Sequence, residues 1–174
     1  MKRVLLMGAP GSGKSTQGQM LAEDLGWKWI STGELLRASS EPWIKERLKT
    51  AELFPDEMIH KLLVEALEGA EGAILDGAVR TKAQALAALS PEVGLDTVVL
   101  FEVPREELIR RVLERGREQD TVKIVAQRIE EYDKMKSTVL ATLERGGVKV
   151  LRVDGVGTPE EVQERLREVL KEEE

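Results

Sequence analysis

The sequence predicts an α/β fold with a mainly parallel sheet, and three observations support this class. Five short apolar runs alternate with segments of helical period along the 174 residues. The first and fourth runs are apolar almost throughout, which is typical of strands covered by helices on both faces. The length suits a single domain, and 41% hydrophobic residues suffice for one core. In such folds, ligands bind beyond the carboxyl ends of the strands.

The expected strands are short apolar runs between amphipathic segments. In chain order they are Arg3–Met7, Trp27–Ile30, Ala73–Leu75, Thr97–Val103 and Val148–Val153. Between the runs, apolar residues recur at helical spacing, as Met20, Leu21 and Leu25 do after the first strand. The residues that follow the strands are therefore the candidates for a functional site.

The composition excludes several kinds of protein. With 26 Lys+Arg against 32 Asp+Glu, the net charge of −6 argues against nucleic acid as a partner. The chain has no Cys and one His, so we expect no disulfide framework, no thiol nucleophile and no zinc site. The apolar run in the N-terminal MKRVLLMGAP is too short for a signal peptide or a membrane span. We therefore expect a cytoplasmic protein that binds neither nucleic acid nor membrane.

A phosphate-binding loop is predicted directly after the first strand. Residues 8–15, GAPGSGKS, fit the P-loop pattern G-x-x-x-x-G-K-[ST] at every fixed position. Glycines let backbone N–H groups turn toward a phosphate, and the N-terminus of the following helix adds partial positive charge. Lys14 is expected to reach the β and γ phosphates, and the Ser15 hydroxyl can be a ligand of Mg²⁺. The motif, between a strand and an amphipathic helix, predicts that the chain binds a nucleoside triphosphate.

Further residues suit the chemistry of phosphoryl transfer, which depends on positioning and positive charge. The third strand ends at Asp76, where a P-loop protein keeps a carboxylate near Mg²⁺. A strand-end Asp is also a common turn residue, and beside the loop we favour the metal role. Arginines occur in four groups, at Arg37, at Arg80, at Arg110, Arg111, Arg115 and Arg117, and at Arg128. The alternative for these arginines is pairing with Glu on solvated helix faces.

Four ordered segments resemble the signature segments of the adenylate kinases. They are GAPGSGKSTQ at 8–17, STGELLR at 31–37, DGAVRTKAQ at 76–84, and Gly116-Arg117 followed by Asp120 and Arg128. The likeness continues to Val153-Asp154-Gly155, so it covers essentially the whole chain. It implies a P-loop three-layer sandwich, with five parallel strands in the order 2-3-1-4-5 flanked by helices. The implied reaction is transfer of the γ-phosphoryl of Mg-ATP to AMP, which gives two ADP.

The resemblance also implies roles for individual residues. The catalytic residues it implies are Lys14, Arg80, Arg117 and Arg128. The implied ATP site consists of Gly11, Ser12, Gly13, Lys14, Ser15, Thr16, Arg111, Arg115 and Gly157. The implied AMP site consists of Thr32, Gly33, Arg37, Glu52, Leu53, Phe54, Gly77, Arg80, Gln84, Arg117 and Arg128. The implied metal ligands are Ser15, Thr16 and Asp76.

The expected organisation is one kinase domain over residues 1–174. The resemblance implies a monophosphate-binding arm at about 31–64 and a lid at about 114–122. The lid is short, because only Gly116 separates Arg115 from Arg117. The chain departs from the family pattern at Ala78-Val79, where Phe-Pro is usual, and we expect this change to alter the wall of the monophosphate pocket. It also has Ser15 in place of the usual Gly, so either Ser15 or Thr16 can serve the magnesium.

Two other functions remain open on the sequence alone. A P-loop kinase for a small hydroxyl metabolite, such as shikimate or gluconate, would have a similar core but would not need segments 32–37 and 77–84 together. A non-catalytic nucleotide-binding protein would keep the loop but would not need the lid arginines. We expect a monomeric enzyme that uses ATP, AMP and Mg²⁺ without zinc. The sequence does not fix which monophosphate is preferred or whether GTP replaces ATP.

Overall fold

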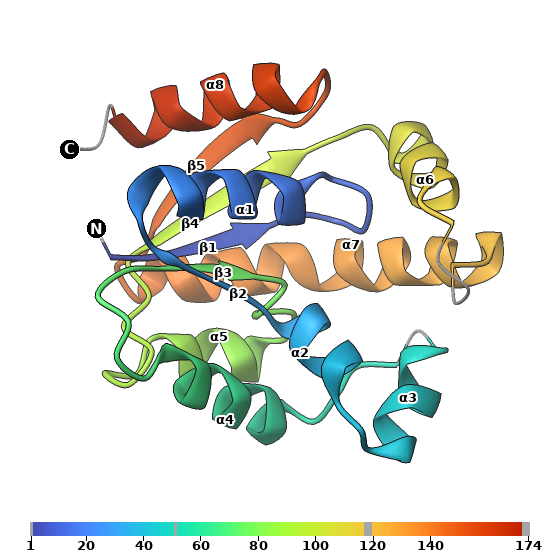
Figure 1. The fold of residues 1–174 in the computed structure, drawn as a ribbon, viewed down its shortest axis with the longest axis horizontal. Coiled ribbons are helices and arrows are strands. Elements are labelled where there is room, and N and C mark those ends of the chain that lie inside the picture. Colours follow the sequence, from blue (N-terminus) through green and yellow to red (C-terminus); the bar gives the residue numbers. More distant parts are fainter. Residues whose placement is uncertain (1, 51, 117–119, 172–174) are drawn as a thin grey trace.

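Five strands form a single parallel sheet in the order β2-β3-β1-β4-β5, as predicted (Figure 1). The computed structural model describes residues 2–50, 52–116 and 120–171. The strands are β1 (Arg3–Met7), β2 (Lys28–Ser31), β3 (Ala73–Asp76), β4 (Thr97–Glu102) and β5 (Lys149–Asp154). Each strand bound lies within one residue of its predicted position.

Helices cover both faces of the sheet and make the fold a three-layer sandwich (Figure 1). One face packs against α1 (Lys14–Leu25) and α8 (Pro159–Lys171). The other face packs against α4 (Asp56–Leu67), α5 (Lys82–Ala88) and α7 (Val122–Arg145). Beyond the carboxyl ends of the strands lie α2 (Thr32–Ala38), α3 (Pro42–Leu48) and α6 (Arg105–Glu114) (Figure 1).

The central strand β1 is buried on both faces from Val4 to Met7, which explains the apolar sequence of these four residues. Leu5 and Met7 pack into the core on the α4, α5 and α7 side, whereas Val4 and Leu6 pack against α1 and α8. Successive side chains of a strand point to opposite faces, so every residue of this run has a core to enter. Full burial of such a side chain contributes about 1.5–3 kcal/mol.

The strand register brings three strand ends together. Asp76 at the end of β3 pairs with Leu6 of β1 on one side and with Ser31 of β2 on the other. The P-loop follows β1, and α2 follows β2 without an intervening turn. The residues that follow these strands therefore share one edge of the sheet.

A smaller apolar cluster fixes α6 and α7 beside the loop after β1. Ala9 of that loop packs with Leu108 and Val112 of α6 and with Val125 and Ile129 of α7. The cluster places the arginines of α6 and α7 next to the same edge of the sheet. Among the described residues, no helix combines the length and the apolar character needed to cross a membrane.

Candidate active site

The loop between β1 and α1 has a backbone that requires glycine. Gly11 and Gly13 have φ values of +88° and +89°, in the left-handed region where other residues are strained. A Cβ on Gly11 would also lie 2.5 Å from the Leu108 backbone oxygen. Helix α1 begins at Lys14, so its N-terminal N–H groups and the positive end of its dipole adjoin the loop.

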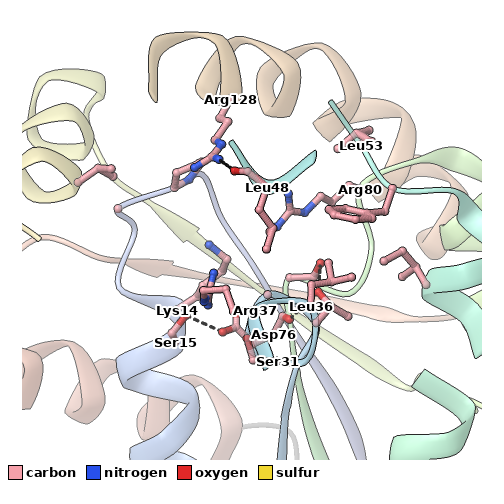
Figure 2. Close-up of a pocket in the computed structure, with 18 of the residues that line it drawn as sticks. Lys14, Ser15, Ser31, Leu36, Arg37, Leu48, Leu53, Asp76, Arg80 and Arg128 are labelled. Carbon is pink, nitrogen blue, oxygen red and sulfur yellow. Dashed lines mark hydrogen bonds between the residues drawn. The ribbon is translucent and has the colours of Figure 1, made fainter. Parts of the chain in front are cut away.

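A cavity of about 410 Å³ opens beside this loop (Figure 2). Its volume is typical of small-molecule sites, which span ~300–1,000 Å³. The cavity brings together predicted residues that lie far apart in the sequence. Those that line it are Gly11, Gly13, Lys14, Ser15, Thr16, Thr32, Gly33, Arg37, Glu52, Leu53, Phe54, Asp76, Gly77, Arg80, Gln84, Arg111, Arg115 and Arg128.

Two of the predicted residues that the structure describes are not part of this lining. Ser12 is buried within the loop, and its Oγ has no hydrogen-bond partner among the described residues. Gly157 lies beside α8, where a Cβ would meet Glu161 Oε2 at 2.5 Å, so the structure does not bring it to the cavity. Arg117 lies outside the described residues.

Neither Ala78 nor Val79 is among the residues that line this cavity. Ala78 is fully buried in the core, and Val79 lines an adjoining cavity of about 70 Å³, which shares Leu53, Gly77, Arg80 and Arg128 with the larger one. Gly77 turns the chain with φ +68°, and the next two side chains enter the protein interior. The substitution therefore changes the packing behind the site and, through Val79, the wall of the smaller cavity that adjoins Arg80 and Arg128.

An oxygen pair suited to a divalent cation lies at the end of β3. Ser15 Oγ donates a 2.6 Å hydrogen bond to Asp76 Oδ2 (Figure 2). Mg²⁺ prefers hard oxygen ligands, takes one or two from the protein and completes its shell with water and substrate phosphates. The pair fits such an ion, and no group of three or more His, Cys, Asp or Glu side chains among the described residues forms a metal cage. Thr16 also lines the cavity.

Positive charges converge on the cavity from three parts of the chain. Arg37 comes from α2, Arg80 from the loop after β3 and Arg128 from α7 (Figure 2). Arg80 remains accessible to water in the cavity. Desolvation by the surrounding protein is the main cause that lowers its pKa, and the charge of Arg128 lowers it further. The negative charge of Asp76 opposes this shift. Such a concentration of guanidinium groups predicts that the cavity binds anions, and phosphate oxygens match the geometry of guanidinium donors.

One buried carboxylate holds two of the predicted ATP-side and transfer arginines. Asp120 Oδ2 accepts from Arg115 Nη2 at 2.6 Å, and its Oδ1 accepts from Arg128 Nη1 at 3.0 Å. The Asp120 side chain is only 1% exposed. Burial lowers the pKa of Arg128, whereas the charge of Asp120 opposes that shift. Asp120 was not among the predicted site residues, although its position in the segment that follows Gly116 and Arg117 was a usable signal.

Arg128 also reaches across the cavity to the loop after α3. Its Nη2 donates to Leu48 O at 2.8 Å (Figure 2) and to Thr50 O at 3.2 Å. A single guanidinium therefore connects α7 to two other segments of the site. These bonds occupy N–H groups of Arg128 that would otherwise donate to a phosphate.

Two buried polar side chains shape the other end of the cavity. Gln84 is 5% exposed, and its Oε1 accepts the Arg80 backbone N–H at 2.7 Å. Thr32 Oγ1 donates to Gly77 O at 2.9 Å, which ties α2 to the loop after β3. Arg111 Nη1 donates to Gly155 O at 3.0 Å on the opposite side.

Residues 6–148 match the sequence model of the adenylate kinase family. An adenylate kinase of Thermus thermophilus is 42% identical over 181 residues, with 96% of this chain and 96% of the relative covered. An adenylate kinase of Micrococcus luteus is 38% identical and covers 95% of this chain and 89% of its own length. An adenylate kinase of Mycobacteroides abscessus is also 38% identical, with 97% and 98% covered.

Proposed function

Because the chain belongs to the adenylate kinase family, we propose that the residues around the large cavity divide between them the binding of ATP, the binding of AMP and the transfer. The chain is an ATP:AMP phosphotransferase. Relatives named adenylate kinase match nearly its full length, so a hydroxyl-metabolite kinase and a non-catalytic binding protein are not favoured. One observation carries the assignment of residues: Lys14, Arg37, Arg80 and Arg128 meet at one cavity beside Asp76.

The ATP site is proposed at the P-loop. The N–H groups of the loop and of the first turn of α1 bind the β and γ phosphates, together with Lys14. Arg111 and Arg115 line the cavity on the same side and complete the donor-nucleotide site. Ser15 and Asp76 hold the magnesium, since their oxygen atoms are already in contact, and Thr16 is the alternative hydroxyl. Magnesium bound with ATP supplies neutralising charge at the phosphate oxygens.

The AMP site is proposed between α2, the loop after α3 and the loop after β3. Arg37 provides charge for the AMP phosphate, and Thr32 and Gln84 provide polar groups near the base. Gly33 allows Arg37 to fold back, since a Cβ there would meet Arg37 Nη2 at 3.1 Å. The backbone of residues 52–54 forms the remaining wall.

Transfer is proposed to proceed in line, without a covalent protein intermediate. Arg80 and Arg128 lie where they can bind the phosphoryl oxygens of both nucleotides and offset the charge that develops during transfer. Asp120 positions Arg128 and Arg115 before substrate binds. The proposed role of Arg117 rests on the resemblance alone, because this residue lies outside the described part of the chain.

The domain organisation is likewise a proposal. The monophosphate-binding arm, about 31–64, comprises α2, α3 and most of α4, and the lid, about 114–122, connects α6 to α7. Support for the arm comes from Arg37 and residues 52–54, which it contributes to the cavity. Support for the lid comes from Arg115 and Asp120, which lie at its two ends.

A coupled assay with ATP tests the function directly. AMP, other nucleoside monophosphates and hydroxy acids such as shikimate and gluconate are offered as acceptors, with and without Mg²⁺. Magnesium-dependent formation of two ADP from ATP and AMP is expected. A parallel series with GTP in place of ATP tests the choice of donor. Phosphorylation of a hydroxy acid with no turnover of AMP would contradict the proposal.

A further inference from the structure

The loop between α3 and α4 carries three of the proposed AMP residues but has little structure of its own. Residues 52–55 form neither helix nor strand, yet Glu52, Leu53 and Phe54 line the cavity. A loop without regular hydrogen bonds needs side chains from elsewhere to hold its backbone in one position. The side chain that does this for residues 52–54 is Arg47, in the last turn of α3.

Arg47 contacts all three residues at once. Its Nε and Nη2 donate to the same acceptor, Leu53 O, at 2.9 and 2.5 Å. Its Nη1 lies 3.3 Å from Glu52 Oε2, and its guanidinium lies 5.7 Å from the centroid of the Phe54 ring. The same ring packs against Trp43 with centroids 6.0 Å apart, so α3 holds Phe54 from two positions.

The contacts of Arg47 orient the backbone of residues 52–54, and do more than attract it by charge. The rigid guanidinium fork fixes the direction of a peptide group when two of its N–H groups share one carbonyl oxygen. Hydrogen bonds from charged donors are also stronger than neutral ones. The Arg47 side chain is 33% exposed, so water competes with these bonds less than on an open surface.

A second arginine, Arg128, bonds to the end of α3 and the start of the same loop, but the proposed function also assigns it to the transferring phosphoryl. Arg128 donates to Leu48 O and Thr50 O, and in the proposed function it turns to the transferring phosphoryl. Arg47 also borders the cavity, but within the described part of the chain the hydrogen bonds and ion pair of its side chain go to Leu53 and Glu52, and the proposed function gives it no task in the transfer. It can therefore keep residues 52–54 in place while substrates are bound.

We propose that Arg47 is a positioning residue for the acceptor nucleotide, because it holds the backbone of residues 52–54 in the form that binds AMP. The inference rests on the proposed function, which places AMP against these residues. Arg47 acts through Leu53 and its neighbours and takes no part in the chemistry of transfer.

The test compares two substitutions on one helix. Arg47→Met keeps an apolar side chain of similar length and removes the guanidinium. Lys45→Met removes the same charge from an exposed position of α3 and serves as the matched control. For Arg47→Met, the KM for AMP is expected to rise about tenfold, while the KM for ATP and kcat change much less. Lys45→Met is expected to behave as the wild type.

Two further measurements separate positioning from charge and from a failure of the proposed function. Arg47→Lys keeps the charge but loses the fork, so its KM for AMP is expected to lie between those of the wild type and Arg47→Met. Hydrogen exchange of peptides covering 48–56 in the nucleotide-free protein is expected to quicken in Arg47→Met, with exchange in the sheet unchanged.

The outcomes are distinct. A wild-type KM for AMP in Arg47→Lys, or equal rises in the KM for AMP and for ATP in Arg47→Met, would overturn the positioning role. Unchanged hydrogen exchange would overturn it as well, whatever the acceptor proves to be. A wild-type protein that does not phosphorylate AMP would instead overturn the proposed function, and the exchange measurement would still decide whether Arg47 orders the loop.

Discussion

At the scale of single residues, the site collects positive charge that the free protein neutralises only in part. Asp120 holds Arg115 and Arg128, and Asp76 is the nearest carboxylate that opposes the lowered pKa of Arg80. Bringing guanidinium groups together costs free energy in the absence of an anion, because like charges repel. Bound phosphates remove that cost, so the same arrangement that strains the free protein favours the complex.

We predict that Lys14→Ala and Arg80→Ala each lower kcat far more than they lower stability. Both side chains line the cavity, and neither is part of an apolar cluster. Loss of transition-state charge stabilisation at such positions costs on the order of 10²–10³ in rate. Steady-state kinetics and thermal unfolding decide the matter, with Lys61→Ala on the exposed face of α4 as the control. Wild-type turnover in either variant would show that its charge does not act on the transferring phosphoryl.

We predict that Arg37→Ala raises the KM for AMP much more than the KM for ATP. Arg37 lies on α2, on the proposed AMP side of the cavity, and Glu34 is its ion-pair partner one turn away. Removal of a phosphate-binding guanidinium costs about 1.5–3 kcal/mol of binding, or ten- to a hundredfold in affinity. Kinetics with each substrate varied in turn provide the measurement. Equal effects on both substrates would place Arg37 outside the AMP pocket.

At the scale of elements, the P-loop is built by backbone shape as much as by side chains. Two of its glycines share almost the same positive φ but differ in their surroundings. A Cβ on Gly11 would meet the Leu108 backbone oxygen at 2.5 Å and Val112 Cγ2 at 2.9 Å, whereas a Cβ on Gly13 would meet nothing within 4 Å. The pair therefore separates backbone strain from steric overlap.

We predict that Gly13→Ala destabilises the protein by about 1–2 kcal/mol, the cost of left-handed backbone in a residue with a Cβ. Gly11→Ala is expected to cost about 1–3 kcal/mol more, because α6 must also move away from the loop. Chemical denaturation of both variants measures the difference. Equal stabilities of the two variants would mean that the contact with α6 gives way without cost.

The arrangement of the helices and strands also explains what could be predicted from the sequence. The strands could be placed within one residue, because strands such as β1 and β4 are buried on both faces and therefore stand out as short apolar runs. The P-loop follows β1, Asp76 ends β3, and Gln84 comes after the loop that follows β3. The topology of the sheet alone therefore brings them to the same edge of it. The burial of Ala78 and Val79 could not be predicted, since the turn at Gly77 decides which way they point and the sequence does not show that direction.

The contacts that Asp120 and Arg47 make could not be predicted for a related reason. Both act by contacts with backbone or side chains whose positions depend on the packing of α3, α6 and α7. From the sequence alone, an arginine on a short helix is expected to be a solvated charge, and a lone Asp is expected to be a helix cap. Only the folded arrangement distinguishes such side chains from ones that position the site.

At the scale of the whole molecule, the cavity lies where separate parts of the chain meet, and Arg128 joins them. Its guanidinium extends from α7 to Asp120 and to the carbonyls of Leu48 and Thr50. Substrate that draws Arg128 toward a phosphate must weaken these contacts. Binding of the two nucleotides and movement of the surrounding segments are therefore coupled through one side chain, as in enzymes that close around their substrates.

The preferred acceptor also depends on the whole molecule, and we predict that it is AMP. Thr32 and Gln84, the polar groups proposed around the base, line the cavity, whereas Ala78 and Val79 lie behind it. A buried site that hydrogen-bonds a base edge discriminates strongly, while one methylene in an apolar wall is worth only ~1–3 kcal/mol. The packing change should therefore relax the ranking of acceptors without reversing it. Specificity constants for AMP, GMP, CMP, UMP and dTMP test this, and AMP in any place but first would mean that packing behind the site governs the choice of base.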